Sequence, residues 1–442
     1  MRATMAIARR ELQAGFLSPL AWGLLAANQF ILAWIFLRVL ERFSGLEAAQ
    51  RSLGLTRELS LNLFSFAAVL ILLSVPLLAM RMISGELRDG TFKLLGAAPV
   101  SLAEVLLGKF LGLGGLVTAL ALLPLLMGVL AAAFVDLDLG LLAAATLGVW
   151  LCGLLFAAVA LFASCLGDQP GLAAVVAYGI LILLSIIGQT GGDGGSLFAW
   201  LSWNEHLFWF LLGVVRSSDL TYFLLGILFF LALAHRRLAN ARLDRAAPKD
   251  SRHRLDRLER RLADGLYYAL LVAAVLLAGW LAARHDGVWD WTESQRNTLG
   301  AESARVVAGL DGALEVTVFS DRGHPLAKRI EPLLARYRSA GARLRVSFVD
   351  PQRFPEQARA AEVSLLGQML LDYRGRRETV REASEAALTA AIARLAREDR
   401  PWVVFLEGHG ERSPEGESAS DLGRFGRLLR ERGYRLQALD LA

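Results

Sequence analysis

This chain is organised around one polar stretch: Arg81-Met82-Ile83-Ser84-Gly85-Glu86-Leu87-Arg88-Asp89-Gly90-Thr91-Phe92-Lys93-Leu94-Leu95. It follows two long apolar runs, and Pro99 separates it from a further apolar run that begins at Leu102. Its charged side chains suit water, while its apolar side chains recur at roughly helical spacing. The pattern predicts a short amphipathic helix at a membrane surface, with an ordinary cytoplasmic loop as the alternative.

The composition divides the chain into two regions. Of its 442 residues, 55% are hydrophobic and the mean hydropathy is +0.44, which is too apolar for an ordinary soluble protein. Residues 1–285 contain nearly all the long apolar runs, whereas residues 286–442 have the composition of a globular domain. We therefore expect at least two domains, one of them in the bilayer.

Seven apolar runs are long enough, or nearly so, to cross a hydrocarbon core of about 30 Å, which takes roughly 20 helical residues. In the third run, the amine of Lys109 can extend to the interface along its flexible stem. Pro76 and Pro124 should kink their helices. Four glycines of the third run should let a neighbouring helix approach closely: Gly108, Gly112, Gly114 and Gly115. The seven runs lie near residues 16–37, 61–83, 104–134, 139–166, 171–189, 219–235 and 266–284.

The net charge of +5 and the pI of about 9.4 come from one loop. Residues 286–442 hold 24 basic and 24 acidic side chains, whereas residues 236–265 hold ten basic and five acidic ones. Nucleic-acid binding is one interpretation, but between two apolar spans the positive-inside rule explains the excess better. With this loop in the cytoplasm, residues 81–103 are also cytoplasmic and the chain after the seventh span is extracytoplasmic.

Strands and helices alternate after the seventh span. Strands are predicted at residues 314–319, 344–349 and 402–406 and from Tyr434 to Leu441, with a hairpin around Gly375. Helices are predicted over residues 324–340, 382–397 and 422–432. This order indicates an α/β, Rossmann-like domain with a largely parallel sheet. Because the chain stops where the next crossover would begin, we expect this domain to be incomplete at its C-terminal end.

The residues give little sign of catalysis. The sequence contains no G-x-x-x-x-G-K-[ST] loop, so this chain cannot hydrolyse ATP by the P-loop mechanism. Cys152 and Cys165 would lie about 20 Å apart on one helix and cannot bridge each other. The six histidines show no metal-ligand spacing. We therefore expect no catalytic residue, no metal and no cofactor bound by this chain.

Two segments have both a structural and a functional interpretation. Residues 197–215 have the pattern of an interfacial or re-entrant helix. In the functional interpretation, Glu205 and His206 of this segment line a substrate exit or a proton site. Glu407, His409 and Glu411 follow a predicted strand, where open α/β sheets bind ligands. They form a candidate ligand loop, with a solvated glycine turn as the alternative.

Two sets of motifs carry a resemblance to known families. The first comprises Ala8-Arg9-Arg10-Glu11-Leu12, Ser18-Pro19-Leu20 and residues 83–95 with Pro99-Val100-Ser101. Through these motifs, residues 1–240 resemble the membrane subunits of type-2 ABC exporters, most of all those of the gliding-motility GldF type. The second comprises Asp290-Trp291-Thr292, Asn297-Thr298-Leu299, Val349-Asp350-Pro351 and residues 406–411, and it resembles the GldG-type auxiliary domain.

The resemblance implies a coupling helix that rests on a separate cytoplasmic ATPase subunit. It places in that helix Ile83, Ser84, Gly85, Glu86, Leu87, Arg88, Asp89, Gly90, Thr91, Phe92 and Pro99. The domains would then be a permease over residues 1–240, a basic cytoplasmic linker over 241–265, a seventh span over 266–284 and a GldG-like extracytoplasmic domain over 285–442.

The expected function is that of a permease subunit of an ABC transporter, an exporter, in the bacterial inner membrane. Its partners would be the ATPase that uses ATP, a second permease copy or homologue, and membrane lipid, with no nucleic acid. One alternative is an ATPase-driven mechanotransmission or regulatory protein that moves no solute. A membrane-anchored enzyme that uses the His409 loop is a further alternative.

Overall fold

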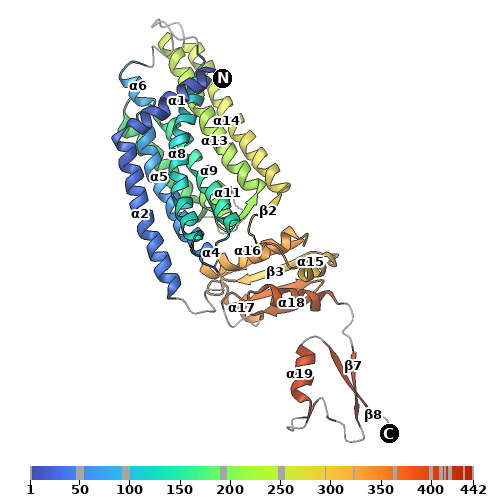
Figure 1. The fold of residues 1–442 in the computed structure, drawn as a ribbon. Coiled ribbons are helices and arrows are strands. Elements are labelled where there is room, and N and C mark those ends of the chain that lie inside the picture. Colours follow the sequence, from blue (N-terminus) through green and yellow to red (C-terminus); the bar gives the residue numbers. More distant parts are fainter. Residues whose placement is uncertain are drawn as a thin grey trace. The chain divides into compact units, whose positions relative to one another are not determined.

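The computed structural model forms two compact units, a helical unit over Met1–Arg296 and an α/β unit over Asn297–Ala442 (Figure 1). The structure describes residues 2–45, 54–91, 100–189, 197–246, 254–293, 295–321, 324–361, 366–397, 402–407, 412, 415–416, 421–431 and 434–440.

Long apolar helices make up the helical unit. Six helical segments of the described residues are long and apolar enough to cross a membrane, one of them the run Leu55–Arg88, which is divided into several elements, and α10 adds a shorter apolar helix of 17 residues. These seven correspond to the seven predicted runs, so the prediction of a multi-pass helical membrane domain is confirmed. The elements are α1 (Arg2–Leu17), α2 (Pro19–Ser44), α4 (Leu55–Leu59), η1 (Ser60–Phe64), α5 (Ser65–Ala79), α6 (Ser84–Arg88), α8 (Leu102–Ala132), α9 (Leu139–Ser164), α10 (Pro170–Ile186), η2 (Ile187–Gln189), α11 (Leu197–Leu201), α12 (Trp203–Leu211), β1 (Val214–Arg216), α13 (Ser217–Ala246), α14 (Arg254–Arg284) and β2 (Val288–Asp290).

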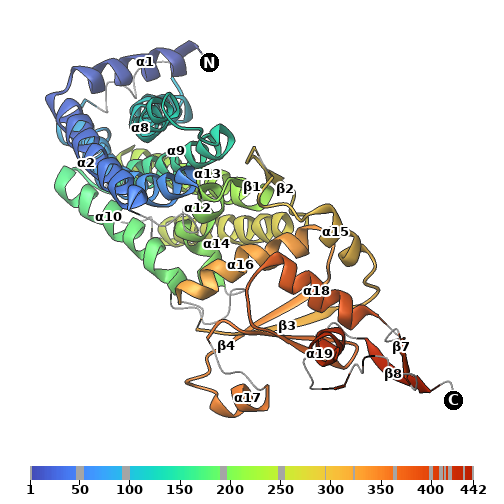
Figure 2. The ribbon, with the colours of Figure 1, turned by 60° about the horizontal axis from the view of Figure 1, so that its bottom comes forward.

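The first predicted run begins too early. Its start, near residue 16, falls in α1, and the chain breaks at Ser18 before α2 begins. Pro19 takes the first position of α2, where its missing N–H costs no hydrogen bond. Helix α1 has no buried residue, so it lies at the surface of the unit and is distinct from α2. In Figure 2, α8 is viewed nearly end-on while α1 runs across the picture.

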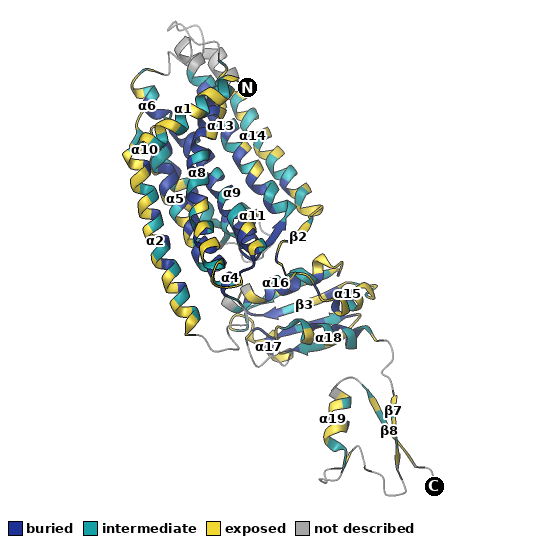
Figure 3. Cartoon of the chain, in the orientation of Figure 1, coloured by how far each residue is buried: buried dark blue, intermediate teal, exposed yellow. Residues whose placement is uncertain are grey.

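Helix α9 is the centre of the unit. It packs against α5, α8, α10, α12 and α13, and most of its residues are buried (Figure 3). A helix that is apolar on all sides is expected to be enclosed in this way. By contrast, α2 and α14 keep large apolar side chains exposed, among them Trp22, Phe30, Trp34 and Trp280. Such faces suit lipid.

Residues 197–215 form two short helices, α11 and α12, and lead into strand β1. Neither helix is long enough to cross a bilayer, as the re-entrant or interfacial interpretation requires. Glu205 is exposed, but His206 is buried.

The α/β unit contains a four-stranded sheet of order β4-β3-β5-β6. Strands β3 (Leu314–Phe319) and β4 (Leu344–Val349) are parallel, but β5 (Met369–Tyr373) and β6 (Arg376–Val380) are antiparallel to their neighbours. The expectation of a largely parallel sheet is therefore wrong for these strands. Arg374 and Gly375, with φ of 53° and 78°, form the two-residue turn that makes β5 and β6 a hairpin.

Helices α15 (Ala301–Ala308), α16 (Pro325–Ser339), α17 (Pro355–Ala360) and α18 (Glu385–Ala396) accompany this sheet. Val316, Ile330 and Leu388 belong to its buried core, and the hydroxyl of Tyr337 lies 2.5 Å from Thr389 Oγ1. Further along the chain, β7 (Trp402–Glu407) and β8 (Arg435–Asp440) form a separate parallel pair joined through α19 (Gly423–Glu431). This β-α-β order agrees with the prediction.

Candidate functional site

The predicted amphipathic helix is only five residues long where the structure describes it. Helix α6 ends before Gly90, whose φ of 74° is the left-handed conformation that glycine adopts past a helix end. Phe92 and Pro99, which the resemblance also placed in the coupling helix, lie outside the described residues.

The start of α6 is fixed to the end of α9. Ile83 and Ser84 are buried, and their backbone N–H groups donate to Ser164 Oγ at 3.2 and 3.0 Å. Ser164 Oγ in turn donates to the carbonyl of Met80 at 3.2 Å. The turn between α5 and α6 is therefore hydrogen-bonded to the end of α9.

Three charged side chains join α6 to two other helices. Lys109 Nζ of α8 lies 2.8 Å from Glu11 Oε1 of α1 and 2.7 Å from Glu86 Oε1 of α6. The side chain of Lys109 is 2% exposed, and those of Glu11 and Glu86 are 15% and 17% exposed. We call Glu11, Glu86 and Lys109 the charged triad.

The burial of the triad corrects the prediction for Lys109. Its amine does not extend to water but remains inside the protein, where an unpaired ammonium would be costly. Two carboxylates against one ammonium leave one excess negative charge. Among the described residues, the second oxygen of Glu86, Oε2, is buried without a hydrogen-bond partner. Among the described residues, Lys109 is the side chain that joins the two carboxylates.

Glycines of α8 let α1 come close enough for these contacts. A Cβ on Gly108, Gly112 or Gly115 would lie 2.5 to 2.7 Å from side-chain atoms of Ile7, Glu11 or Leu12. The predicted close approach of a neighbouring helix is confirmed, and the neighbour at these three positions is α1. A Cβ on Gly114 would instead meet Leu154 of α9 at 3.3 Å.

The other side of α6 is open. The side chains of Arg88 and Asp89 are 59% and 60% exposed, with Arg88 Nε 3.3 Å from Asp89 Oδ1. Thr91 is also exposed, and its hydroxyl donates to the carbonyl of Glu86 at 3.4 Å. The segment therefore has an anchored side and a charged side available for contact.

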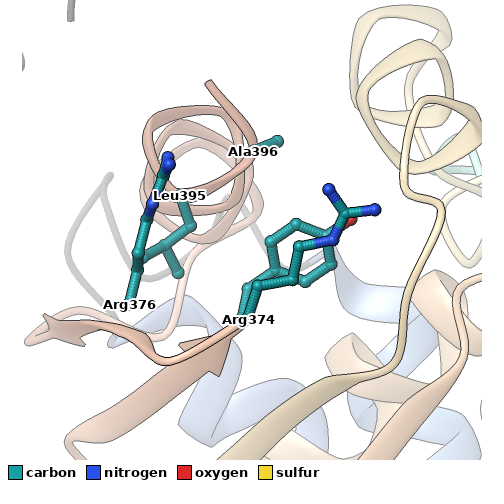
Figure 4. Close-up of a pocket in the computed structure, with 5 residues that line it drawn as sticks. Arg374, Arg376, Leu395 and Ala396 are labelled. Atoms are coloured by element: carbon teal, nitrogen blue, oxygen red, sulfur yellow. The ribbon is translucent and has the colours of Figure 1, made fainter. Parts of the chain in front are cut away.

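The candidate ligand loop lies mostly outside the described residues. Glu407 is the last residue of β7, while His409 and Glu411 lie outside the described residues. A pocket of about 170 Å³ in the α/β unit is lined by other residues: Tyr373, Arg374, Arg376, Leu395 and Ala396 (Figure 4). It contains none of the predicted site residues.

Comparison with protein families supports the interpretation of the N-terminal region. Residues 5–210 match the model of the ABC-2 family transporter proteins. Residues 293–389 match a domain of unknown function, DUF7088. A comparison with curated proteins found no match. The first match supports a permease subunit of an ABC transporter, a non-catalytic membrane component that works with a partner ATPase.

Sequence reasoning missed the partners of Lys109 and the surroundings of His206. A lone lysine in an apolar run was a signal that a carboxylate would lie nearby. Asp219 Oδ1 lies 2.7 Å from His206 Nδ1, and Arg216 donates to both oxygens of Asp219 at 2.7 and 2.8 Å. His206 is thus part of a buried polar cluster, while Glu205 is not.

Proposed function

We propose that this chain is the permease of an ABC exporter, fused to an extracytoplasmic domain, and that its α6 segment receives the movement of a separate ATPase. The observation that carries the proposal is the two-sided α6. Its inner side is tied to α1, α8 and α9, and its outer side exposes Arg88, Asp89 and Thr91.

The coupling mechanism follows from these contacts. ATP binding would close the ATPase dimer and displace α6, on which the ATPase rests. Because Glu86 is paired with Lys109 and Ser84 is bonded to Ser164, that displacement passes to α8 and α9 as a rigid-body shift. Glu86 acts as a positioning residue here, while Arg88 and Asp89 are the groups that meet the ATPase.

The finer assignments belong to the same proposal. The α6 end of the bundle would lie in the cytoplasm of a bacterial inner membrane, on the same side of the membrane as the basic residues 236–265. Two permease units, identical or related, enclose the translocation path. The region after α14 is a GldG-like α/β domain outside the cytoplasm, as in gliding-motility transporters.

Exchange of charges on the open side of α6 tests the proposal. The chain is co-expressed with an ABC-type P-loop ATPase from its own genome that copurifies with the wild type, and the variant Arg88→Glu/Asp89→Arg is expected to lose most of this ATPase. The matched control is Arg38→Glu/Glu41→Arg, another exposed pair (N–O distance 3.0 Å) near the far end of α2.

Two further variants test whether the α6 segment must be held in place. Glu86→Arg places a second cation beside Lys109, and Gly90→Val strains a residue with φ of 74°, so both should uncouple ATP hydrolysis or release the ATPase. Unchanged ATPase copurification and unchanged transport in all these variants would refute the assignment.

A further inference from the structure

Residues 286–293, directly after α14, dock on the helical unit instead of forming a free linker. Strand β2 pairs antiparallel with β1, and Val215 lies opposite Trp289. Two backbone hydrogen bonds extend the ladder, from Trp291 N to Gly213 O at 2.9 Å and from Ser217 N to Gly287 O at 2.8 Å. We call residues 286–293 the docking segment.

Its first residue lies at the start of α13. Asp286 Oδ1 accepts hydrogen bonds from Ser218 N at 2.9 Å and from Ser217 Oγ at 3.1 Å. A carboxylate at this position satisfies a free N–H group and interacts favourably with the helix dipole. Ser217 Oγ also accepts from Gly287 N at 2.8 Å. A segment about 70 residues further along the chain thus supplies the cap of α13.

Its last residue lies at the start of α9. Asp138 is buried and uses both carboxylate oxygens: Oδ1 accepts from Leu141 N at 2.9 Å, and Oδ2 accepts from Glu293 N at 3.2 Å. The N–H of Asp138 donates to Thr56 Oγ1 of α4 at 3.0 Å. One side chain therefore caps α9 and holds the docking segment.

Two glycines leave room for the segment. A Cβ on Gly140 would lie 1.8 Å from the carbonyl oxygen of Trp291, so no other residue fits there without displacing the segment. Gly213 has φ of 83°, and its Cβ would lie 2.6 Å from Cγ2 of Thr292, which is itself buried. Together with the edge of β1, these positions form a receptor for one extended peptide.

The receptor rests on the buried polar cluster. Arg216 of β1 holds Asp219, which in turn holds His206 of α12. The ring of His206 stacks on Tyr222 of α13 with centroids 3.8 Å apart. These contacts attach strand β1 to α12 and α13. A force on the docking segment would therefore act on both helices through β1.

We propose that the docking segment is a mechanical joint: it binds the region that begins at Asn297 to the ends of α9, α12 and α13 by strand addition. Helix α9 then carries a contact at each end, Ser164 with α6 and Asp138 with the docking segment. A shift of α9 reaches the following domain through this joint and not only through α14. The attachment itself does not depend on the proposed exporter function.

A cleavage experiment tests the attachment. A protease site is inserted between Ala246 and Arg254, the full chain is purified in detergent through an N-terminal tag and then cut. Because the docking segment adds its contacts to those of α14 with α13, most of the C-terminal fragment should stay with the N-terminal one. Trp291→Pro, which removes the donor to Gly213 O, and Gly140→Val should each lower the retained fraction at least tenfold.

The matched control is Gly179→Val in α10, where an added Cβ meets nothing within 4 Å. Loss of the fragment from the wild type, or equal retention in the wild type and Trp291→Pro, overturns the proposal. If Gly140→Val does not fold, hydrogen exchange on intact Trp291→Pro protein decides. Exchange at the N–H groups of Ser218 and Glu293 should speed up at least tenfold, whereas wild-type rates there would contradict the joint.

Discussion

At the level of single residues, substitution of Lys109 can show whether the charged triad stabilises the fold, couples the helices, or does both. Replacing it by Met leaves the carboxylates of Glu11 and Glu86 close together without a counter-ion, which should cost about 3–5 kcal/mol. The melting temperature in detergent should fall clearly below that of the wild type. A Lys109→Met variant that melts like the wild type would contradict this account of the triad.

A neutral triad is the control for that experiment. In Lys109→Met/Glu11→Gln/Glu86→Gln no buried charge lacks a partner, so most of the lost stability should return. The tie between α1, α6 and α8 remains weakened, and ATP hydrolysis by the complex should therefore stay poorly coupled. Recovery of both stability and coupling would show that the charges only stabilise the fold.

Glu205 and His206 give a second test at this scale, because neighbours in the sequence have opposite environments. His206→Ala removes the ring that contacts Asp219 and Tyr222 and should cost about 2–3 kcal/mol. Glu205→Ala changes an exposed side chain and should stay within about 0.5 kcal/mol. Thermal unfolding in detergent measures both, and equal effects would argue against a special role for the cluster.

At the level of elements, the packing of α1 on α8 depends on glycine. Gly112→Val would bring Cβ to about 2.6 Å from the Cβ of Glu11, so α1 must move away and the Glu11–Lys109 pair must lengthen. Overpacking of this kind costs about 1–3 kcal/mol. We expect lower melting temperature and less copurifying ATPase, whereas Gly179→Val should change neither. An unaffected Gly112→Val complex would remove α1 from the coupling path.

The same elements show what could be predicted from the sequence. Apolar runs and period-two alternation located the long helices and the strands from β3 to β8, because both signals are local in the chain. The glycines of α8 predicted a close neighbour, but not that it would be α1. The contact between Asp138 and Glu293 spans 155 residues and leaves no local pattern, so the docking segment could not be found. Lys109 was placed wrongly for the same reason: its partners lie on other helices.

At the scale of the whole molecule, helix α9 links the α6 segment at one end, through Ser164, to the docking segment at the other end, through Asp138. The α6 end suits the receipt of movement, and the other end holds the docking segment that leads to Asn297. This arrangement serves an exporter, and it equally serves a protein that moves its following domain without moving a solute. An ATP-dependent transport assay in vesicles separates the two, because only an exporter accumulates solute.

The sidedness of the chain is the last prediction, and two buried cysteines make it easy to measure. Cys152 and Cys165 are almost fully buried, so a membrane-impermeant maleimide should react little with the wild type. Ser339→Cys in the α/β unit adds an exposed thiol. If the basic residues 236–265 lie in the cytoplasm, this thiol should be labelled on spheroplasts. Ser251→Cys, within the basic loop, should be labelled only after the membrane is permeabilised. The opposite pattern would invert the topology, and it would move the exposed charges of α6 to the side that lacks ATP.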